Sequence, residues 1–226
     1  MNVLKRPPES VLFDLDGTLV DTAGEFVAIV QAMRSERDLQ PLDEHLIRRV
    51  VSNGANALVS LAFDSEVDTP LHEALRDEFL NRYAAQLGQS AQPYPALREL
   101  VGDIARAGIP WGVVTNKLRR FAEPLMASLN FLPEANVLVT PCDVTAAKPD
   151  PEAILHACSR VSARPEGSLY IGDHARDIEA GRRAGCITIA ASYGYLTGID
   201  DPESWGADLI VDSSQELATL IRQAMA

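Results

Sequence analysis

Short apolar runs recur along this chain with helix-like stretches between them, and this alternation constrains the fold more than any other feature of the sequence. The runs are Val11–Asp14, Trp111–Thr115, Val137–Thr140, Leu169–Gly172, Cys186–Ala190 and Leu209–Val211. Strands that are apolar throughout and alternate with helices are typical of a parallel sheet covered by helices on both faces. The sequence therefore predicts an α/β fold with a Rossmann-like, parallel-sheet core.

The expected helices of this core begin or end at residues suited to helix ends. Pro151 occupies a first-turn position, and Gly108 and Gly185 follow two of the helical stretches. The stretches are Ala96–Ala107, Arg119–Leu129, Pro151–Val161, Asp177–Ala184 and Gln215–Ala224.

The alternation stops between about residues 22 and 88, where no strand pattern occurs. Apolar residues there recur at helical spacing in groups that begin at Phe26, Leu46, Ala57 and Leu75. The following segment, Gly88–Pro95, has the polar and proline-rich composition of a linker. We therefore expect two units: a core made of residues 1–21 and 92–226, and an inserted, all-helical cap with its linkers over residues 22–91.

Two carboxylates follow the first apolar run, in the segment Asp14-Leu15-Asp16-Gly17-Thr18. In an open α/β sheet, ligands bind outside the carboxyl ends of the strands. Two carboxylates at such a position repel each other unless a positive charge, usually a metal ion, lies between them. The pair suits a carboxylate nucleophile beside a second carboxylate that acts as acid and base. An Asp-Gly turn with a spare acid is the alternative interpretation.

Three further segments carry polar residues that could act on a phosphate group. Thr115 and Asn116 end the second run, where a hydroxyl and a backbone N–H can hold phosphoryl oxygens. Lys148 precedes a proline-initiated helix and could supply a fixed positive charge. Asp173 and Asp177 suit a hard cation. Taken singly, each has an alternative role: helix capping for Thr115, Asn116 and Asp177, and a solvated loop position for Lys148.

These four segments, in this order and with a helical insert after the first, resemble the motifs of the haloacid-dehalogenase-like superfamily of phosphatases. The resemblance covers nearly the whole chain, and the insert looks like the cap of the phosphoglycolate phosphatase branch. Within that branch, three segments are similar to the N-acetylmuramic acid 6-phosphate phosphatases of bacterial wall recycling: Trp111–Lys117, Phe121–Pro124 and Trp205–Asp208. His174 departs from the superfamily pattern, which usually has serine, threonine or an acid at that place.

The resemblance implies a magnesium-dependent phosphomonoester hydrolase. Asp14 would attack phosphorus and form an aspartyl phosphate. Asp16 would protonate the leaving alkoxide and then take a proton from the attacking water. Thr115, Asn116 and Lys148 would stabilise the phosphoryl oxygens. The ligands of Mg²⁺ would be Asp14, the backbone carbonyl of Asp16, Asp173 and Asp177.

The segment Val51–Val59 resembles the substrate loop in the caps of this branch, and we expect Asn53 and Gly54 to bind the substrate there. Phosphoglycolate and N-acetylmuramic acid 6-phosphate both carry a carboxylate besides the phosphate, and an arginine could bind this group in a bidentate manner. Arg49, or its neighbour Arg48, is the candidate. The substrate stays open between these two acids and another sugar phosphate.

Other reactions of the superfamily fit the residues less well. A dehalogenase lacks the second acid of the first segment, here Asp16. A phosphonatase uses a cap lysine as a Schiff base, and residues 22–88 contain no lysine. A phosphomutase shares Asp14 and Asp16 and stays open as an alternative, as does a non-catalytic binding protein with the same fold.

The charge balance and the cysteines bear on partners and location. Lysine and arginine number 20 against 32 acidic residues, and the net charge of −12 disfavours nucleic acid and anionic membranes as partners. Cys142, Cys158 and Cys186 have no metal-binding spacing and suit a reducing compartment. Residues 1–10 contain no apolar signal segment. We expect a cytoplasmic enzyme of carbohydrate metabolism, monomeric or homodimeric, whose partner is a small phosphate ester.

Overall fold

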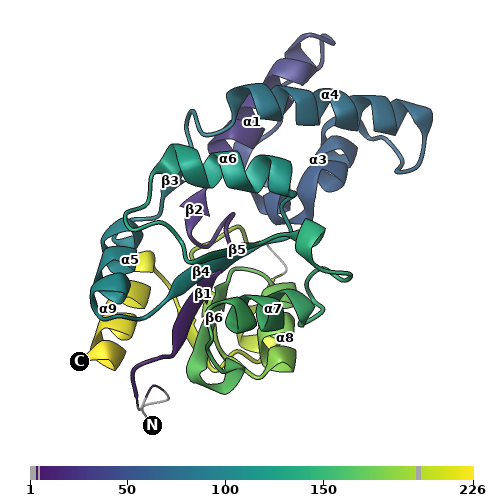
Figure 1. The fold of residues 1–226 in the computed structure, drawn as a ribbon. Helices are drawn as coiled ribbons and strands as arrows, with labels where there is room; N and C mark the ends of the chain where they lie inside the picture. Colours follow the sequence, from purple (N-terminus) through teal and green to yellow (C-terminus); the bar gives the residue numbers. More distant parts are fainter. Residues whose placement is uncertain (1–3, 5, 197–199) are drawn as a thin grey trace.

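A six-stranded parallel sheet forms the centre of the molecule in the computed structural model, which describes residues 4, 6–196 and 200–226 (Figure 1). The strand order is β5-β4-β1-β6-β7-β8. The strands are β1 (Ser10–Phe13), β4 (Trp111–Val114), β5 (Val137–Val139), β6 (Ser168–Gly172), β7 (Ile187–Ala191) and β8 (Leu209–Val211). This confirms the predicted α/β fold with a parallel-sheet core. Residues 1–3 and 5 of the expected core segment lie outside the described residues. They are part of residues 1–10, from which the absence of a signal segment was predicted.

Helices cover both faces of the sheet, and the alternation of side chains along β1 explains why. Val11 and Phe13 pack into one buried cluster, and Leu12 packs into another on the opposite face. The first cluster contains residues of α5 (Leu97–Arg106), α6 (Arg119–Leu129) and α9 (Ser214–Met225), and the second contains residues of α7 (Glu152–Arg160) and α8 (Ala175–Ala184). Because both faces of the sheet are buried, apolar and polar residues do not alternate along these strands.

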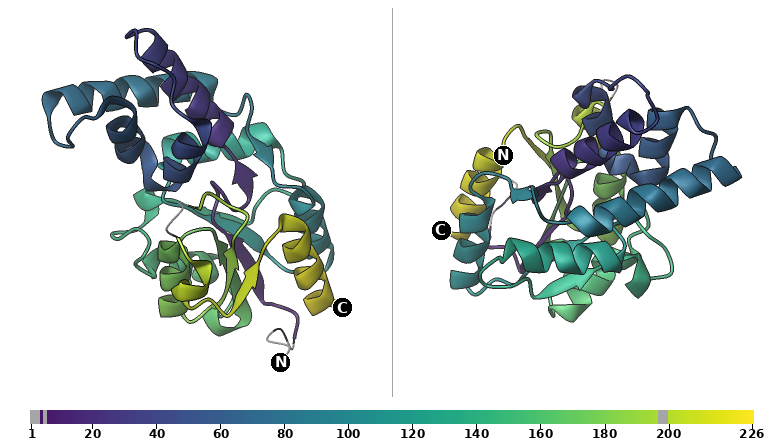
Figure 2. Two further views of the ribbon diagram at one scale, coloured as in Figure 1. Left: turned by 180° about the vertical axis from the view of Figure 1, so that it is seen from behind. Right: turned by 90° about the horizontal axis from the view of Figure 1, so that it is seen from above.

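The insert forms a separate group of helices beyond the carboxyl ends of the strands (Figures 1 and 2). Its helices are α1 (Ala23–Ser35), α2 (Glu44–Val50), α3 (Gly54–Phe63) and α4 (Pro70–Gln86). They share a buried cluster that also takes in Phe121 and Tyr195 of the core, and in it the ring of Phe26 contacts those of Phe79 and Tyr83. Thr69 caps α4 by accepting a hydrogen bond from the His72 N–H, and Pro70 follows at the first helical position.

A two-stranded antiparallel ribbon joins the insert to the core. β2 (Val20–Asp21) enters the insert, and β3 (Gln92–Pro93) leaves it. The sequence analysis placed no strand in either segment, since two residues are too few for a strand pattern to be recognised. The ribbon lies at the two junctions where the cap was expected to begin and end.

The sheet order brings three strand ends together. In the register of the sheet, Phe13 pairs with Val113 of β4 on one side and with Ile171 of β6 on the other. The residues that follow these strands, Asp14, Thr115 and Asp173, therefore emerge side by side at one edge, facing the insert. In the described part of the chain, no helix has both the length and the apolar character that a membrane crossing requires.

Gly112 lies inside β4, where an added Cβ would come within 2.4 Å of Val137 Cγ1 and 2.9 Å of the Val137 carbonyl oxygen. We expect Gly112→Ala to lower the free energy of unfolding by about 1–3 kcal/mol, because the methyl group overpacks the sheet. Urea unfolding measures this change.

The matched control is Gly102→Ala in α5, where the nearest atom to an added Cβ is the Leu132 carbonyl oxygen at 3.7 Å. Since alanine is the better helix former, this variant should gain about 0.5–1 kcal/mol. Losses of equal size in both variants would contradict the packing argument.

Candidate active site

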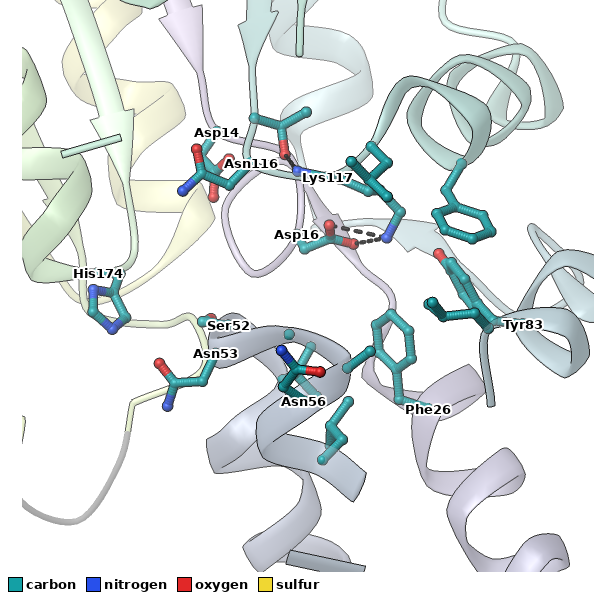
Figure 3. A pocket seen from close by; sticks show the side chains of 18 of the residues that line it. Asp14, Asp16, Phe26, Ser52, Asn53, Asn56, Tyr83, Asn116, Lys117 and His174 are labelled. Carbon is teal, nitrogen blue, oxygen red and sulfur yellow. Dashed lines mark hydrogen bonds and ion pairs between the residues drawn. The ribbon is translucent and has the colours of Figure 1, made fainter. Parts of the chain in front are cut away.

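A cavity of about 510 Å³ lies between the ends of the central strands and the insert. Figure 3 shows Asp14, Asp16, Asn116 and Lys117 on its core side. Further lining residues come from the insert, among them Phe26, Ser52, Asn53, Gly54, Asn56 and Tyr83. The expected core residues and the expected loop Val51–Val59 therefore face one cavity.

Lys148 is the centre of the polar contacts at the bottom of the cavity. Its Nζ donates hydrogen bonds to Asp14 Oδ1 at 2.7 Å, to the Val114 carbonyl at 2.9 Å and to the Tyr170 hydroxyl at 2.8 Å. It also forms an ion pair with Asp177 Oδ1 at 2.7 Å. Burial alone would lower the Lys148 pKa, but the carboxylates of Asp14 and Asp177 raise it well above its usual value. The side chain is therefore a fixed positive charge.

Three buried carboxylates gather around this lysine. One oxygen atom from each of Asp14, Asp173 and Asp177 lies within 4.8 Å of the others. Burial raises the Asp14 pKa to about 6, although Lys148 opposes the shift. Burial and the neighbouring carboxylates raise the Asp173 pKa well above its usual value. When all three are ionised, their charges against one ammonium leave two negative charges in excess, which together with burial raises these pKa values. Because the donors are all oxygen, the residues fit a hard divalent cation.

Two glycines allow the chain to approach Asp173 closely. An added Cβ at Gly17 would lie 2.1 Å from Asp173 Oδ2, and one at Gly194 would lie 2.3 Å from Asp173 Cβ. The Asp173 carboxylate also accepts hydrogen bonds from the Tyr195 N–H at 2.9 Å and from Thr18 Oγ1 at 3.3 Å. The glycine of the first sequence segment is thus required by the packing around a residue far along the chain.

The carboxylate of Asp16 points toward Lys117 (Figure 3). Lys117 Nζ lies 2.9 and 3.0 Å from the two Asp16 carboxylate oxygens, and Thr22 Oγ1 donates to Asp16 Oδ1 at 2.6 Å. The same ammonium lies 5.1 Å from the ring centre of Phe26 and 4.6 Å from that of Tyr83. Lys117 was not among the predicted site residues, although it directly follows Thr115 and Asn116.

Asn116 binds the loop that carries Lys148. Its side-chain amide donates to the Lys148 carbonyl at 2.9 Å and accepts from the Lys148 N–H at 3.1 Å. The hydroxyl of Thr115 accepts from the Lys117 N–H at 3.1 Å. Both residues line the cavity, so one strand end positions the two lysines of the site.

The insert reaches the core through the expected substrate loop. Ser52 Oγ donates to Asp173 Oδ2 at 3.3 Å, and Asn53 Oδ1 accepts from Arg176 Nη2 at 2.8 Å. Gly54 lines the cavity with φ of +80°, a backbone conformation that favours glycine. The loop therefore lies against the residues that could hold a metal ion.

Arg49, the expected carboxylate-binding residue, does not line this cavity. It lines a second, smaller hollow of about 280 Å³ beside Asp21, His45 and Arg48. Arg48 forms an ion pair with Asp21 at 3.3 Å. Three other arginines line the cavity instead, and none of them was among the predicted site residues: Arg76, Arg120 and Arg176.

Two histidines have local structural contacts. His174 accepts a hydrogen bond from the Arg176 N–H at 3.2 Å and so caps α8, which begins two residues before the predicted Asp177. His72 is buried rather than at the surface. Its Nδ1 lies 2.9 Å from Ser65 Oγ, and its Nε2 lies 3.4 Å from Oδ1 of Asn56, which lines the cavity.

Comparison with known proteins identifies relatives along nearly the full chain. The chain is 50% identical over 217 residues to an N-acetylmuramic acid 6-phosphate phosphatase of Pseudomonas aeruginosa, covering 96% of each. It is 40% identical over 212 residues to a phosphoglycolate phosphatase of Xanthomonas campestris, covering 94% of this chain and 96% of that one.

The fold is shared with solved structures. A crystal structure of a predicted phosphoglycolate phosphatase from Haemophilus somnus matches with a TM-score of 0.82 at 24% identity, covering 94% of this chain and 97% of that one. The family model described as haloacid dehalogenase-like hydrolase matches residues 11–191. The sequence expectation is thereby confirmed: the chain belongs to the haloacid dehalogenase-like hydrolase family.

Proposed function

We propose that the protein is a magnesium-dependent phosphomonoesterase that works through an aspartyl-phosphate intermediate. The observation that carries the proposal is the position of Asp14, which is paired with the fixed charge of Lys148 and lies among carboxylates that suit a divalent cation. Phosphatase names among relatives with 50% and 40% identity support the same reaction class.

Mg²⁺ would be held by Asp14, Asp173, Asp177 and the backbone carbonyl of Asp16. When bound, it would neutralise and orient a phosphate group. Lys148 keeps the Asp14 carboxylate in one orientation at the cavity floor. Asp14 attacks phosphorus in line, and the new P–O bond forms as the bond to the leaving oxygen breaks. The hydroxyl of Thr115, the Asn116 N–H and Lys148 stabilise the phosphoryl oxygens as charge develops.

Asp16 serves both halves of the proposed reaction. It lies two residues after the nucleophile on the same turn, and Thr22 and Lys117 hold its carboxylate at the cavity wall. In the first step it gives a proton to the leaving alkoxide. In the second step it takes a proton from the water that cleaves the aspartyl phosphate, and inorganic phosphate is released. The insert excludes bulk water during both steps.

N-acetylmuramic acid 6-phosphate is our first candidate substrate, and phosphoglycolate is the second. The relative named for the first acid is 50% identical to this chain, against 40% for the relative named for the second. A cavity of about 510 Å³ suits a sugar-sized ligand, whereas two carbons and a phosphate leave most of it unfilled.

Release of inorganic phosphate from both acids, with and without Mg²⁺, tests the proposed function. We expect kcat/KM to be at least about tenfold higher for N-acetylmuramic acid 6-phosphate, because binding to the insert can be used only by the larger leaving group. Isomerised sugar phosphate in place of inorganic phosphate would indicate a phosphomutase. No turnover of any phosphomonoester would reject the enzyme class.

Asp14→Asn should abolish turnover, by about 10³-fold or more, since an amide cannot act as the nucleophile. Phosphate release and thermal unfolding should be measured together. Asp38→Asn is the control, because Asp38 is exposed and its φ of 56° suits asparagine equally well. Substantial activity in Asp14→Asn would reject Asp14 as the nucleophile.

Mg²⁺ should stabilise the protein more at about pH 8 than at about pH 5. Because the folded-state pKa of Asp14 is raised to about 6, the folded protein holds a proton that the unfolded chain releases. Without metal, the free energy of unfolding therefore falls as pH rises from about 4 to about 6. Mg²⁺ binds the ionised carboxylates and offsets this loss.

Thermal unfolding in Mg²⁺ and in EDTA, at matched ionic strength, measures the difference. We expect the Mg²⁺ shift in Tm to be several degrees at about pH 8 and roughly one degree or less at about pH 5. Asp173→Asn should remove most of the Mg²⁺ shift in Tm at about pH 8. Equal shifts at both pH values would argue against metal binding by these carboxylates.

A further inference from the structure

One face of α4 extends along the cavity for two helical turns. Arg76, Phe79, Leu80 and Tyr83 all line the cavity. Their spacing of three, four and seven residues places them on one side of the helix. Phe121 of α6 faces Tyr83 with ring centres 5.3 Å apart, so the walls between the two ends of the cavity are aromatic and apolar.

Tyr83 marks the end of this face where the chemistry would occur. Its ring centre is 4.6 Å from Lys117 Nζ, and that atom is 2.9 Å from Asp16 Oδ1. Arg76 lies seven residues earlier, which is about 10 Å along the helix axis at 1.5 Å per residue. Side chains on a helix tilt toward its N-terminus, so the guanidinium of Arg76 extends farther from Tyr83 rather than back toward it.

The guanidinium of Arg76, at the far end of this face, is only partly paired. Arg76 Nε is buried without a hydrogen-bond partner among the described residues. Asp77 also lines the cavity, but its ion pair with Arg76 is long, at 3.4 Å. Because the Asp77 side chain is 66% exposed, its carboxylate competes weakly for the guanidinium. Arg120 of α6 lines the same cavity, and its guanidinium stacks 4.6 Å from the ring centre of Phe121, the residue that faces Tyr83.

We propose that Arg76, with Arg120 on the opposite wall, binds an anionic group on the leaving alcohol of the substrate and so determines specificity. The inference rests on the proposed phosphatase function. It assigns to α4 and α6 the role that the sequence analysis gave to Arg49, which lines a different hollow.

The separation of Tyr83 and Arg76 along α4 also indicates the length of the substrate. The carboxylate of a two-carbon acid phosphate extends only about 5 Å from phosphorus, given bond lengths near 1.5 Å. This reach is about half of the roughly 10 Å that separates Tyr83 from Arg76 along α4. The substrate class is an extended phosphomonoester with an anionic group on the far side of a body that packs on Phe79 and Tyr83.

Two probes that differ mainly in one carboxylate test this assignment: N-acetylmuramic acid 6-phosphate, and N-acetylglucosamine 6-phosphate, which lacks the lactyl group. We expect Arg76→Gln to lower kcat/KM for the first probe by about 10- to 100-fold, mainly through KM, and to change it less than about threefold for the second. Arg120→Gln should act in the same direction, and Arg76→Lys should retain part of the preference.

Arg106→Gln is the matched control, because Arg106 is a 77% exposed arginine on the core helix α5. Thermal unfolding of each variant separates loss of fold from loss of recognition. Equal losses on both probes, no loss on the acidic probe, or a selective loss in Arg49→Gln instead would overturn the assignment. If the unaltered protein hydrolyses neither probe nor a simple aryl phosphate, the proposed function fails first.

Discussion

The buried ammonium of Lys148 is the interaction on which the rest of the site depends. It joins Asp14 at the end of β1, the Val114 carbonyl at the end of β4, the Tyr170 hydroxyl on β6 and Asp177 on α8. Breaking a buried ion pair from one side typically costs about 3–5 kcal/mol, because the other charge stays buried without a partner. The same contact therefore holds the strand ends together and fixes the orientation of the proposed nucleophile. It compensates one carboxylate and leaves the excess charge that a divalent cation would balance.

The junction between insert and core uses a second lysine in a different way. Lys117 bonds to Asp16 on the core and lies against the rings of Phe26 and Tyr83 on the insert. Ser52 and Asn53 add hydrogen bonds to Asp173 and Arg176. The insert is thus held in part by contacts to residues of the site itself, in addition to those around Tyr195. Its position and the arrangement of the carboxylates are coupled.

The sheet, the helices and the core site residues could be predicted from the sequence because each depends on local order. A strand end fixes where the next residue points, so Asp14, Thr115 and Asp173 follow from the strand pattern alone. Lys117 was missed because its contacts, with Asp16 and with the rings of Phe26 and Tyr83, come from segments far from it in sequence that only the folded chain brings near. Arg76 lies in an ordinary helical pattern, and the sequence does not reveal which side of α4 faces the cavity. Arg49 was chosen for its nearness in sequence to the substrate loop, but the turn of α2 directs it elsewhere.

The short ribbon of β2 and β3 has a consequence for how this architecture can change over time. Asp21 pairs with Gln92, so the chain leaves the core and returns to it at almost the same point. Relative to the core, the whole insert is therefore one loop whose two ends are held together by the ribbon. The entropy of closing such a loop grows only slowly with its length. Helices can therefore be added, removed or exchanged in the insert while the catalytic framework stays intact, and new leaving groups become accessible without new chemistry.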